Sequence, residues 1–391
     1  MRRREKGMGM AGRVLRVDNN RVGYAELFYD LVFVFAITQV SHYLLYHYSL
    51  IGAAETALLF LAVWWVWIYT TWVLNWLDPE AFAVRILLFG MMAAGLFLSM
   101  AVPDAFGARG LVFAGAYVAM QLGRSLYMLW VIWSQPNRRA TYYRISGYFI
   151  LSAVFWIWGA MAEDQGHRLT LWAVALGVEY LGPLASYRVP GFGSDVTTNW
   201  RVSGAHMAER CGLFVIICLG ETLLVSGATF AEMDWSGIGL LAFLSSVLGT
   251  GAMWWVYFHI GHQRGAHQIE HAEDSGAIAR RSFTYYHIPI VAGIVLGAVG
   301  AERAIAHPEH LASIAEGAAI IGGLILFLFG NGLFKKASAE WFPLSHWVGL
   351  GLCGLTIATG PWMNLLTQNA LAALILIVVA IWEHRSLSAK A

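Results

Sequence analysis

AELFYDLVFVFAITQVSH, residues 25–42, begins a run of apolar residues long enough to cross a membrane as one helix. Glu26 and Asp30 stand near its start, four positions apart and therefore on one face of that helix. A charged side chain inside a bilayer costs about 2.5 to 3.5 kcal/mol on insertion scales, so such carboxylates face protein or water. The stretch predicts a membrane helix with one polar face.

The composition extends this prediction to the whole chain. Of its 391 residues, 58% are hydrophobic and 13% are charged, whereas soluble domains carry about 25% charged residues. The net charge of +1 and the scattered basic residues argue against a nucleic-acid partner. Cys211, Cys218 and Cys353 all lie in apolar runs, which favours buried thiols over a disulfide framework or a cysteine metal site.

Twelve apolar runs have the length of a membrane span, and each is continuously apolar, which predicts helices and not barrel strands. We therefore expect an all-α polytopic membrane protein. The runs cover about 24–45, 53–76, 82–103, 110–133, 145–162, 169–187, 209–228, 236–260, 282–303, 316–335, 343–360 and 364–383. Ten spans are the alternative, if the weaker fifth or eleventh run pairs with a neighbour as a re-entrant segment.

Basic residues predict the orientation. If the N-terminus is cytoplasmic, only Arg109, Arg168 and Arg303 fall on the opposite side, and Arg124 lies inside the fourth span. Short cytoplasmic loops are enriched in Lys and Arg. We expect both termini in the cytoplasm, residues 1–23 as a basic cytoplasmic tail, and the bacterial plasma (inner) membrane as the location.

Two stretches indicate an internal repeat. AVWWVWIY from Ala62 matches AMWWVYFH from Ala252, and Ala25-Glu26 matches Ala208-Glu209 in the same order. Chance similarity between Trp-rich membrane helices is the alternative. The matches predict two parallel six-helix repeats, 24–190 and 205–385.

Ionisable residues inside the spans are the candidate functional groups. Counted at about 1.5 Å per residue, Asp30 and Arg124 lie at similar depths, which suggests an ion pair with either a structural or a pathway role. Glu179 and Glu221 fall near the bilayer centre with no obvious basic partner. Each is either a proton or cation site or a neutral acid hydrogen-bonded between helices. The candidate pathway residues are Glu26, Asp30, Arg124, Glu179, Glu209, Arg210, Glu221 and His287.

Histidines crowd the segment after the eighth span. HQIEH, residues 267–271, matches the H-x-x-E-H pattern of one zinc-protease class. No third ligand with a recognisable spacing follows, so zinc at His267 and His271 is an alternative to the expectation that the protein has no cofactor.

Three stretches resemble the bacterial low temperature requirement protein A family: residues 25–42, HMAERCGLFVIICLGETLL from His206, and FTYYHIPIVAGIVL from Phe283. That family is named for a growth phenotype, so the resemblance implies a membrane protein and no particular activity.

The first span is also similar, more distantly, to a two-repeat potassium-channel family of endolysosomes and prokaryotes. Phe28, Tyr29 and Asp30 take the places of its Phe-Ser-Asp motif, although Tyr24 stands where that family has Arg. The similarity implies that Phe33, Ile37 and Thr38 line a pore. A potassium filter does not carry over.

These features favour a protein that conducts or transports a cation, a proton or a monovalent metal ion, along a path near the first and seventh spans. The alternatives are a membrane-embedded enzyme acting on lipid-type substrates and a non-catalytic scaffold or stress sensor. The expected partners are the lipid bilayer, a small cation and, as an option, further copies of the chain.

Overall fold

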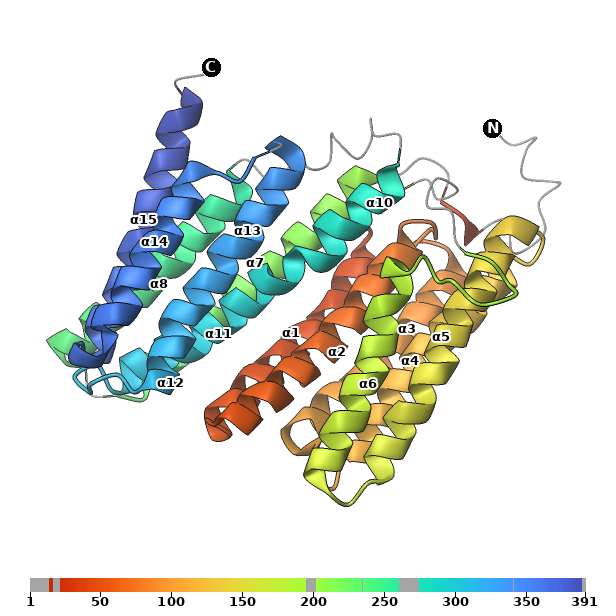
Figure 1. The fold of residues 1–391 in the computed structure, drawn as a ribbon, viewed down its shortest axis with the longest axis horizontal. Helices are drawn as coiled ribbons and strands as arrows, with labels where there is room; N and C mark the ends of the chain where they lie inside the picture. The colour runs from red at the N-terminus through yellow and green to blue at the C-terminus, as the bar shows by residue number, and fades with distance from the viewer. Residues whose placement is uncertain are drawn as a thin grey trace. The chain divides into compact units, whose positions relative to one another are not determined.

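Helices joined by turns account for the described structure (Figure 1). The computed structural model describes residues 14–16, 22–194, 202–233, 235–259, 274–339 and 341–388. The first half forms α1 (Tyr24–Tyr46), α2 (Leu50–Leu74), α3 (Phe82–Ala101), α4 (Gly110–Val131), α5 (Pro136–Met161) and α6 (Gln165–Leu184). The second half forms α7 (Gly204–Ala231), α8 (Gly237–Phe258), α10 (Ser275–Ala279), α11 (His287–Ala306), α12 (Ile314–Gly317), α13 (Gly323–Ala339), α14 (Leu344–Thr359) and α15 (Leu365–Ser388).

Within the described ranges, nine helical segments are long and apolar enough to cross a membrane. α4 and α6 match them in length but are less apolar, and α14 is apolar but has only 16 residues. The chain is therefore a multi-pass membrane protein whose helices contact lipid, as its composition predicts. The twelve-span layout remains a prediction.

Several helices begin before the apolar run that predicted them. The fifth run was expected from residue 145, but α5 begins at Pro136 and includes the polar stretch PNRRATYYR. Proline is well suited to the first turn of a helix because its missing N–H would have no partner there. The apolar run marks the part of a helix that crosses hydrocarbon, and the helix itself continues into the interfacial region.

The chain divides into two compact units. The first consists of Met1–Tyr43, Leu50–Met207 and Glu273–Gly276, and the second of Leu44–Ser49, Ala208–Ala272 and Ala277–Ala391. The duplication itself stays a prediction.

Aromatic residues and one arginine hold the first unit together. The side chains of Trp65, Trp156 and Trp172 are fully buried, and the rings of Trp65 and Tyr180 stack with centroids 3.8 Å apart. At one end of the unit, the Arg168 guanidinium donates to five backbone carbonyls, those of Ala105, Gly107, Gly159, Ala160 and Ala162. It thereby ties the turn before α4 to the end of α5, where helix carbonyls have fewer backbone donors.

The second unit relies on close contact between α11 and α13. A Cβ atom on Gly293 would lie 2.5 Å from the backbone nitrogen of Phe327, and one on Gly323 would lie 2.7 Å from the backbone nitrogen of Gly297. Glycine allows the two backbones to come this close. The resulting van der Waals contacts hold the helices together, since lipid provides no hydrophobic force between them. Two π-helical segments, η5 (Arg280–Tyr285) and η6 (Ala318–Gly322), interrupt the same region.

Gly293→Ala should destabilise the protein by about 1 to 3 kcal/mol, because the new methyl group must push the two backbones apart. Unfolding of the detergent-purified protein measures this loss. Gly297→Ala is the matched control, since its Cβ would meet only the Met253 methyl group, at 3.7 Å. Equal stability of the two variants would contradict the packing described above.

Candidate functional site

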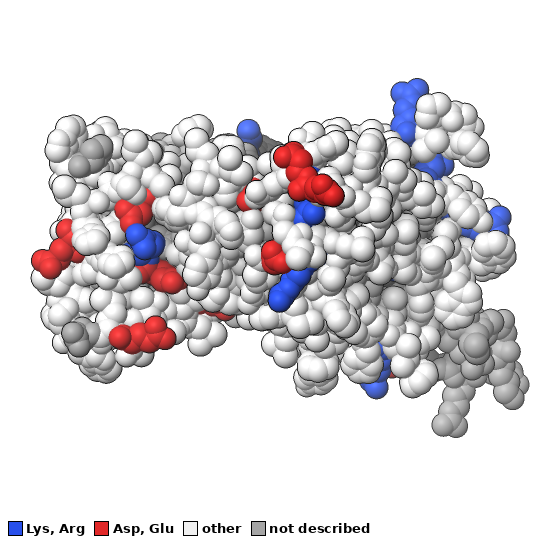
Figure 2. All heavy atoms as spheres, turned by 90° about the horizontal axis from the view of Figure 1, so that it is seen from below, with Lys and Arg blue, Asp and Glu red and all other residues white. Residues whose placement is uncertain are grey.

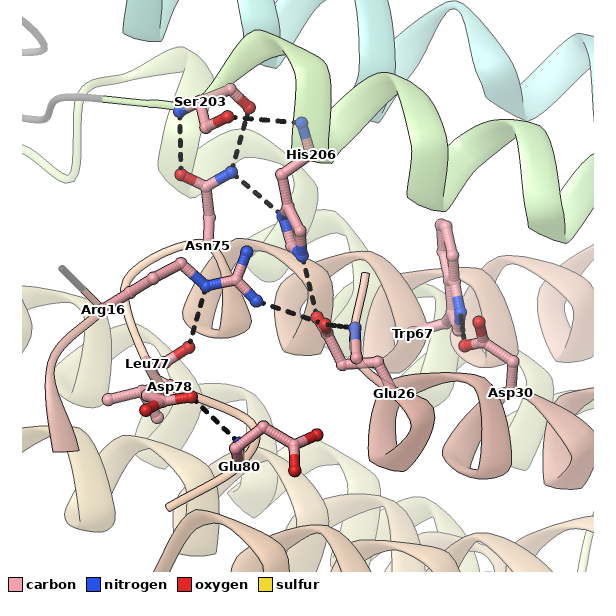
Figure 3. A network of polar contacts seen from close by, with 11 residues as sticks. Arg16, Glu26, Asp30, Trp67, Asn75, Leu77, Asp78, Glu80, Ser203 and His206 are labelled. Carbon is pink, nitrogen blue, oxygen red and sulfur yellow. Dashed lines mark hydrogen bonds and ion pairs between the residues drawn. The ribbon is translucent and has the colours of Figure 1, made fainter. Parts of the chain in front are cut away.

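Glu26 lies at the centre of a polar network at one end of the first unit (Figure 3). Its buried carboxylate accepts hydrogen bonds from the Arg16 guanidinium at 3.2 Å and from the Gly23 backbone at 2.7 Å, and it contacts the His206 Nε2 at 2.8 Å. Arg16 also donates to the Leu77 carbonyl. The network joins the segment before α1, the residue after α2 and the first turn of α7, so Glu26 is a structural anchor of this unit.

Asn75 determines the tautomer of His206. The Ser203 backbone N–H donates to Asn75 Oδ1 at 3.0 Å, so the Asn75 amide nitrogen must be the atom that faces His206 Nδ1, at 3.1 Å. An amide nitrogen only donates, hence Nδ1 accepts and the proton is on Nε2, which points at Glu26. Arg16 supplies a positive charge beside Glu26.

Asp30 and Arg124 do not form the ion pair that their depths suggested. Asp30 accepts from the Trp67 indole at 2.8 Å (Figure 3). Arg124 donates to the Val66 carbonyl, to the Thr70 hydroxyl and to the side-chain oxygen of Gln121. Similar depth places two residues at the same level of the membrane, but each helix is turned so that its charged residue meets other partners.

Glu179 is held by four donors from two other helices. Tyr117 and Gln121 of α4 donate to Oε2 at 2.6 and 2.9 Å, and Ser152 and Trp156 of α5 donate to Oε1 at 2.6 and 3.1 Å. A carboxylate has about four lone-pair positions, so all of them are occupied. Glu179 and its four donors, the Glu179 cluster, lie fully inside the first unit.

Gln121 connects this carboxylate to a positive charge. Its amide nitrogen donates to Glu179, and its amide oxygen accepts from Arg124. Arg124 and Glu179 thus balance each other through one neutral side chain. Such an arrangement satisfies both charges where water is absent. The sequence interpretation, which found no basic partner for Glu179, missed this bridge.

Glu221 has a different environment. It lies in the middle of α7, about 15 Å of helix from the nearer end, and its exposed fraction is 6%. The structure shows no hydrogen bond or ion pair between its carboxylate and any other described residue. The lone pairs of its two carboxylate oxygens are therefore not used by any other described residue.

Comparison with known proteins shows the family of the chain. A model of the bacterial low temperature requirement A protein (LtrA) family matches residues 21–381. The chain belongs to the LtrA family. It is 42% identical over 375 residues to an uncharacterised protein of Rhizobium meliloti, and the alignment covers 95% of this chain and 90% of that protein. No solved structure matches it.

The three LtrA-like stretches carry most of the candidate residues. Glu209 is partly buried and Arg210 is buried in α7, on the same helix as Glu221. The ring of His287 lies between the Ser282 carbonyl and the Tyr257 hydroxyl, each 2.8 Å from a ring nitrogen. Because a carbonyl only accepts, Nδ1 carries a proton. His287 thereby ties α8 to the π-helical segment η5.

The remaining predicted site residues divide into two groups. Phe33 and Ile37 are buried in the first unit, and the Thr38 hydroxyl donates to the Val34 carbonyl of its own helix. Their role in lining a pore stays a prediction. His267 and His271 lie outside the described residues, and among those that are described no three His, Cys, Asp or Glu side chains are arranged to hold a metal ion.

Sequence reasoning missed several buried polar residues. Glu55 contacts the Tyr43 hydroxyl at 2.8 Å, and Lys335 donates to both oxygens of Glu383, at 2.8 and 2.7 Å. The face Tyr117, Gln121, Arg124 could have been found, because positions three and four apart on a helix are neighbours. The partners of Glu55 and Lys335 are far apart in sequence and carry no local signal.

Gln121→Leu should destabilise the first unit by at least about 3 kcal/mol, since two hydrogen bonds to charged groups are lost and each contributes about 1.5 to 3 kcal/mol. Unfolding in detergent measures this change. Ser125→Ala, one turn further along α4, is the control, because the Ser125 hydroxyl bonds only the Gln121 backbone carbonyl and its loss should cost little. A Gln121→Leu variant as stable as Ser125→Ala would show that the bridge is not needed.

Proposed function

We propose that this LtrA-family protein moves a cation, a proton or a monovalent metal ion, across the membrane, with Glu221 as the group that binds it. The observation that supports this proposal is the contrast between two buried carboxylates inside apolar helices, Glu179 of α6 and Glu221 of α7. Glu179 is saturated by four donors, whereas Glu221 has none among the described residues. The first has no vacant lone pair for a ligand, and the second has all of its lone pairs available.

The path near α1 and α7 that the sequence predicts is part of this proposal. α7 carries Glu221, and Glu209 and Arg210 lie three turns before it on the same helix. An intramembrane carboxylate of this kind is typical of ion and proton pathways. The proposal needs no cofactor, and assembly into homo-oligomers is compatible with it.

The proposed location is the inner membrane, with both termini in the cytoplasm. The turns after α1, α3 and α5 carry or adjoin Glu55, Asp104, Glu163 and Asp164, and the turns after α7 and α11 adjoin Glu232, Glu302, Glu309 and Glu316. Figure 2 shows acidic side chains, with a few basic ones among them, at the surface seen from below. Because Lys and Arg favour the cytoplasmic side, we propose that the end of each unit that carries these turns is the outer one.

Glu221→Gln should lower cation flux by about tenfold or more, since the loss of one charged ligand costs at least about 1.4 kcal/mol of binding. Flux is measured in proteoliposomes with an internal pH dye under imposed H⁺, Na⁺ or K⁺ gradients. Glu232→Gln changes an exposed carboxylate just beyond the end of the same helix and should leave the flux unchanged. Absence of flux in the unmodified protein under every gradient would refute the proposal, as would full flux in Glu221→Gln.

The orientation has a separate test. Alkaline phosphatase joined after Glu309, in the turn between α11 and α12, should be active because that enzyme folds only outside the cytoplasm. Green fluorescent protein joined to the C-terminus should fluoresce because it matures in the cytoplasm. If the phosphatase is inactive and the C-terminal fusion is dark, in cells that insert both proteins, the topology is the opposite of the one proposed.

A further inference from the structure

A small, partly open cavity of about 40 Å³ lies in the second unit, between α7, α8, α11, α13, α15 and the π-helical segment η6. Five polar side chains contribute to its lining, namely Thr222, Ser245, Ser246, Thr250 and Asn369. All five are at least nine-tenths buried. The rest of the lining is apolar or glycine, so these five determine what the cavity can bind.

Every hydroxyl in this lining has already used its proton. Ser245 and Ser246 both donate to the Ala242 carbonyl, at 2.8 and 3.1 Å. Thr250 donates to the Ser246 carbonyl at 2.9 Å, and Thr222 donates to the Cys218 carbonyl at 3.1 Å. These are bonds to the preceding turn of the same helix, which serine and threonine commonly make inside helices. Only oxygen lone pairs are left for the cavity.

The amide of Asn369 completes the same pattern. Its nitrogen donates to the hydroxyl oxygens of Ser245 and Ser246, at 2.7 and 2.9 Å. The orientation of the amide follows from the network, because hydroxyls whose protons are committed elsewhere can only accept. Asn369 Oδ1 accepts no hydrogen bond from any described residue. The amide therefore adds a fifth oxygen and no spare donor.

A lining of acceptors alone selects a positively charged ligand. Among the described residues its lining contains no carboxylate. Divalent cations such as Ca²⁺ and Mg²⁺ are bound mainly by carboxylates, so a monovalent cation fits the charge of this lining. The volume is that of about three water-sized spheres, at about 10 to 15 Å³ each.

Two further features point to a binding role. η6 replaces the regular start of α13 with π-helical turns and places Ile320 in the lining, and such insertions are frequent at functional sites. Three acidic residues near the turns after α7 and α11, Glu232, Glu302 and Glu309, belong to the same unit, where Glu316 is paired with Arg303. The negative charge of these three carboxylates attracts cations to that end of the unit.

We infer that this cavity, formed by four hydroxyl oxygens and the Asn369 amide oxygen, is a binding site for a small monovalent cation. The inference rests on the proposed function in one respect, that the bound ion is the one the protein moves. Glu221 is not part of the lining, so binding here and flux through Glu221 can be measured separately.

Thermal unfolding of the full chain in detergent tests the inference. NaCl, KCl or NH₄Cl replaces choline chloride at constant ionic strength. At least one of the three cations should raise Tm by a few degrees, and this rise should level off as the cation concentration increases. Choline, a bulkier cation that cannot be held closely by five oxygens, serves as the reference cation. Equal Tm values in all four salts would overturn the inference and show that the cavity holds water only.

Thr250→Val tests the site itself, because valine keeps the shape and removes one oxygen. The half-saturating concentration of the stabilising cation should rise about tenfold, the effect of losing about 1.4 kcal/mol of binding. Thr356→Val is the matched control, since Thr356 is buried in α14 of the same unit, donates to its own helix and lies outside the cavity. Asn369→Leu, which removes the amide, is the second test if Thr250→Val does not fold. A cation response that Thr250→Val or Asn369→Leu leaves intact would place the ion elsewhere.

The outcomes separate this inference from the proposed function. Flux that depends on Glu221, without any cation effect on Tm, would reject the cavity site and leave the transport proposal standing. A saturable cation effect that Thr250→Val weakens, without any flux, would support the site and reject transport.

Discussion

The hydrocarbon interior of a membrane offers no hydrogen bonds, and the structure of this protein depends on how its buried polar groups find partners within the protein. Glu179 shows the constraint most clearly, because four donors surround it and Gln121 links it to Arg124. α4, α5 and α6 must pack in one particular rotation for these contacts to form together. The polar cluster therefore specifies how the aromatic core of the first unit is assembled.

The second unit meets the same constraint in another way. Glycines bring α11 and α13 into backbone contact, and serine and threonine hydroxyls bond the carbonyls of their own helices. Its buried charges include the Lys335–Glu383 pair, which lies near the ends of α13 and α15. A unit built in this way leaves oxygen lone pairs available inside it. These lone pairs, and the carboxylate of Glu221, are the groups on which we base the proposed cation binding.

Several features of the site were accessible from the sequence, and others were not. The positions of Glu26, Asp30, Glu179 and Glu221 inside apolar helices follow from counting residues along each run. The predicted pairing of Asp30 with Arg124 was wrong because it used only the depth of each residue in the membrane, and two residues at the same depth need not be neighbours. Whether two side chains meet also depends on the rotation of each helix about its axis, which is set by all of its packing contacts. Gln121 lies three positions before Arg124 on α4, and this spacing indicates in the sequence that the two side chains are neighbours.

The sequence by itself determined that this is a multi-pass helical membrane protein of the LtrA family, and which of the predicted spans contain carboxylates. These properties are local, since the length of an apolar run and the cost of a charge within it do not depend on distant residues. Only the tertiary structure decided which carboxylates are satisfied and which remain open. The donors to Glu179 come from 23 to 62 positions away along the chain, and the oxygens of the cavity come from α7, α8 and α15. Their meeting is a property of helix packing, which no single segment specifies.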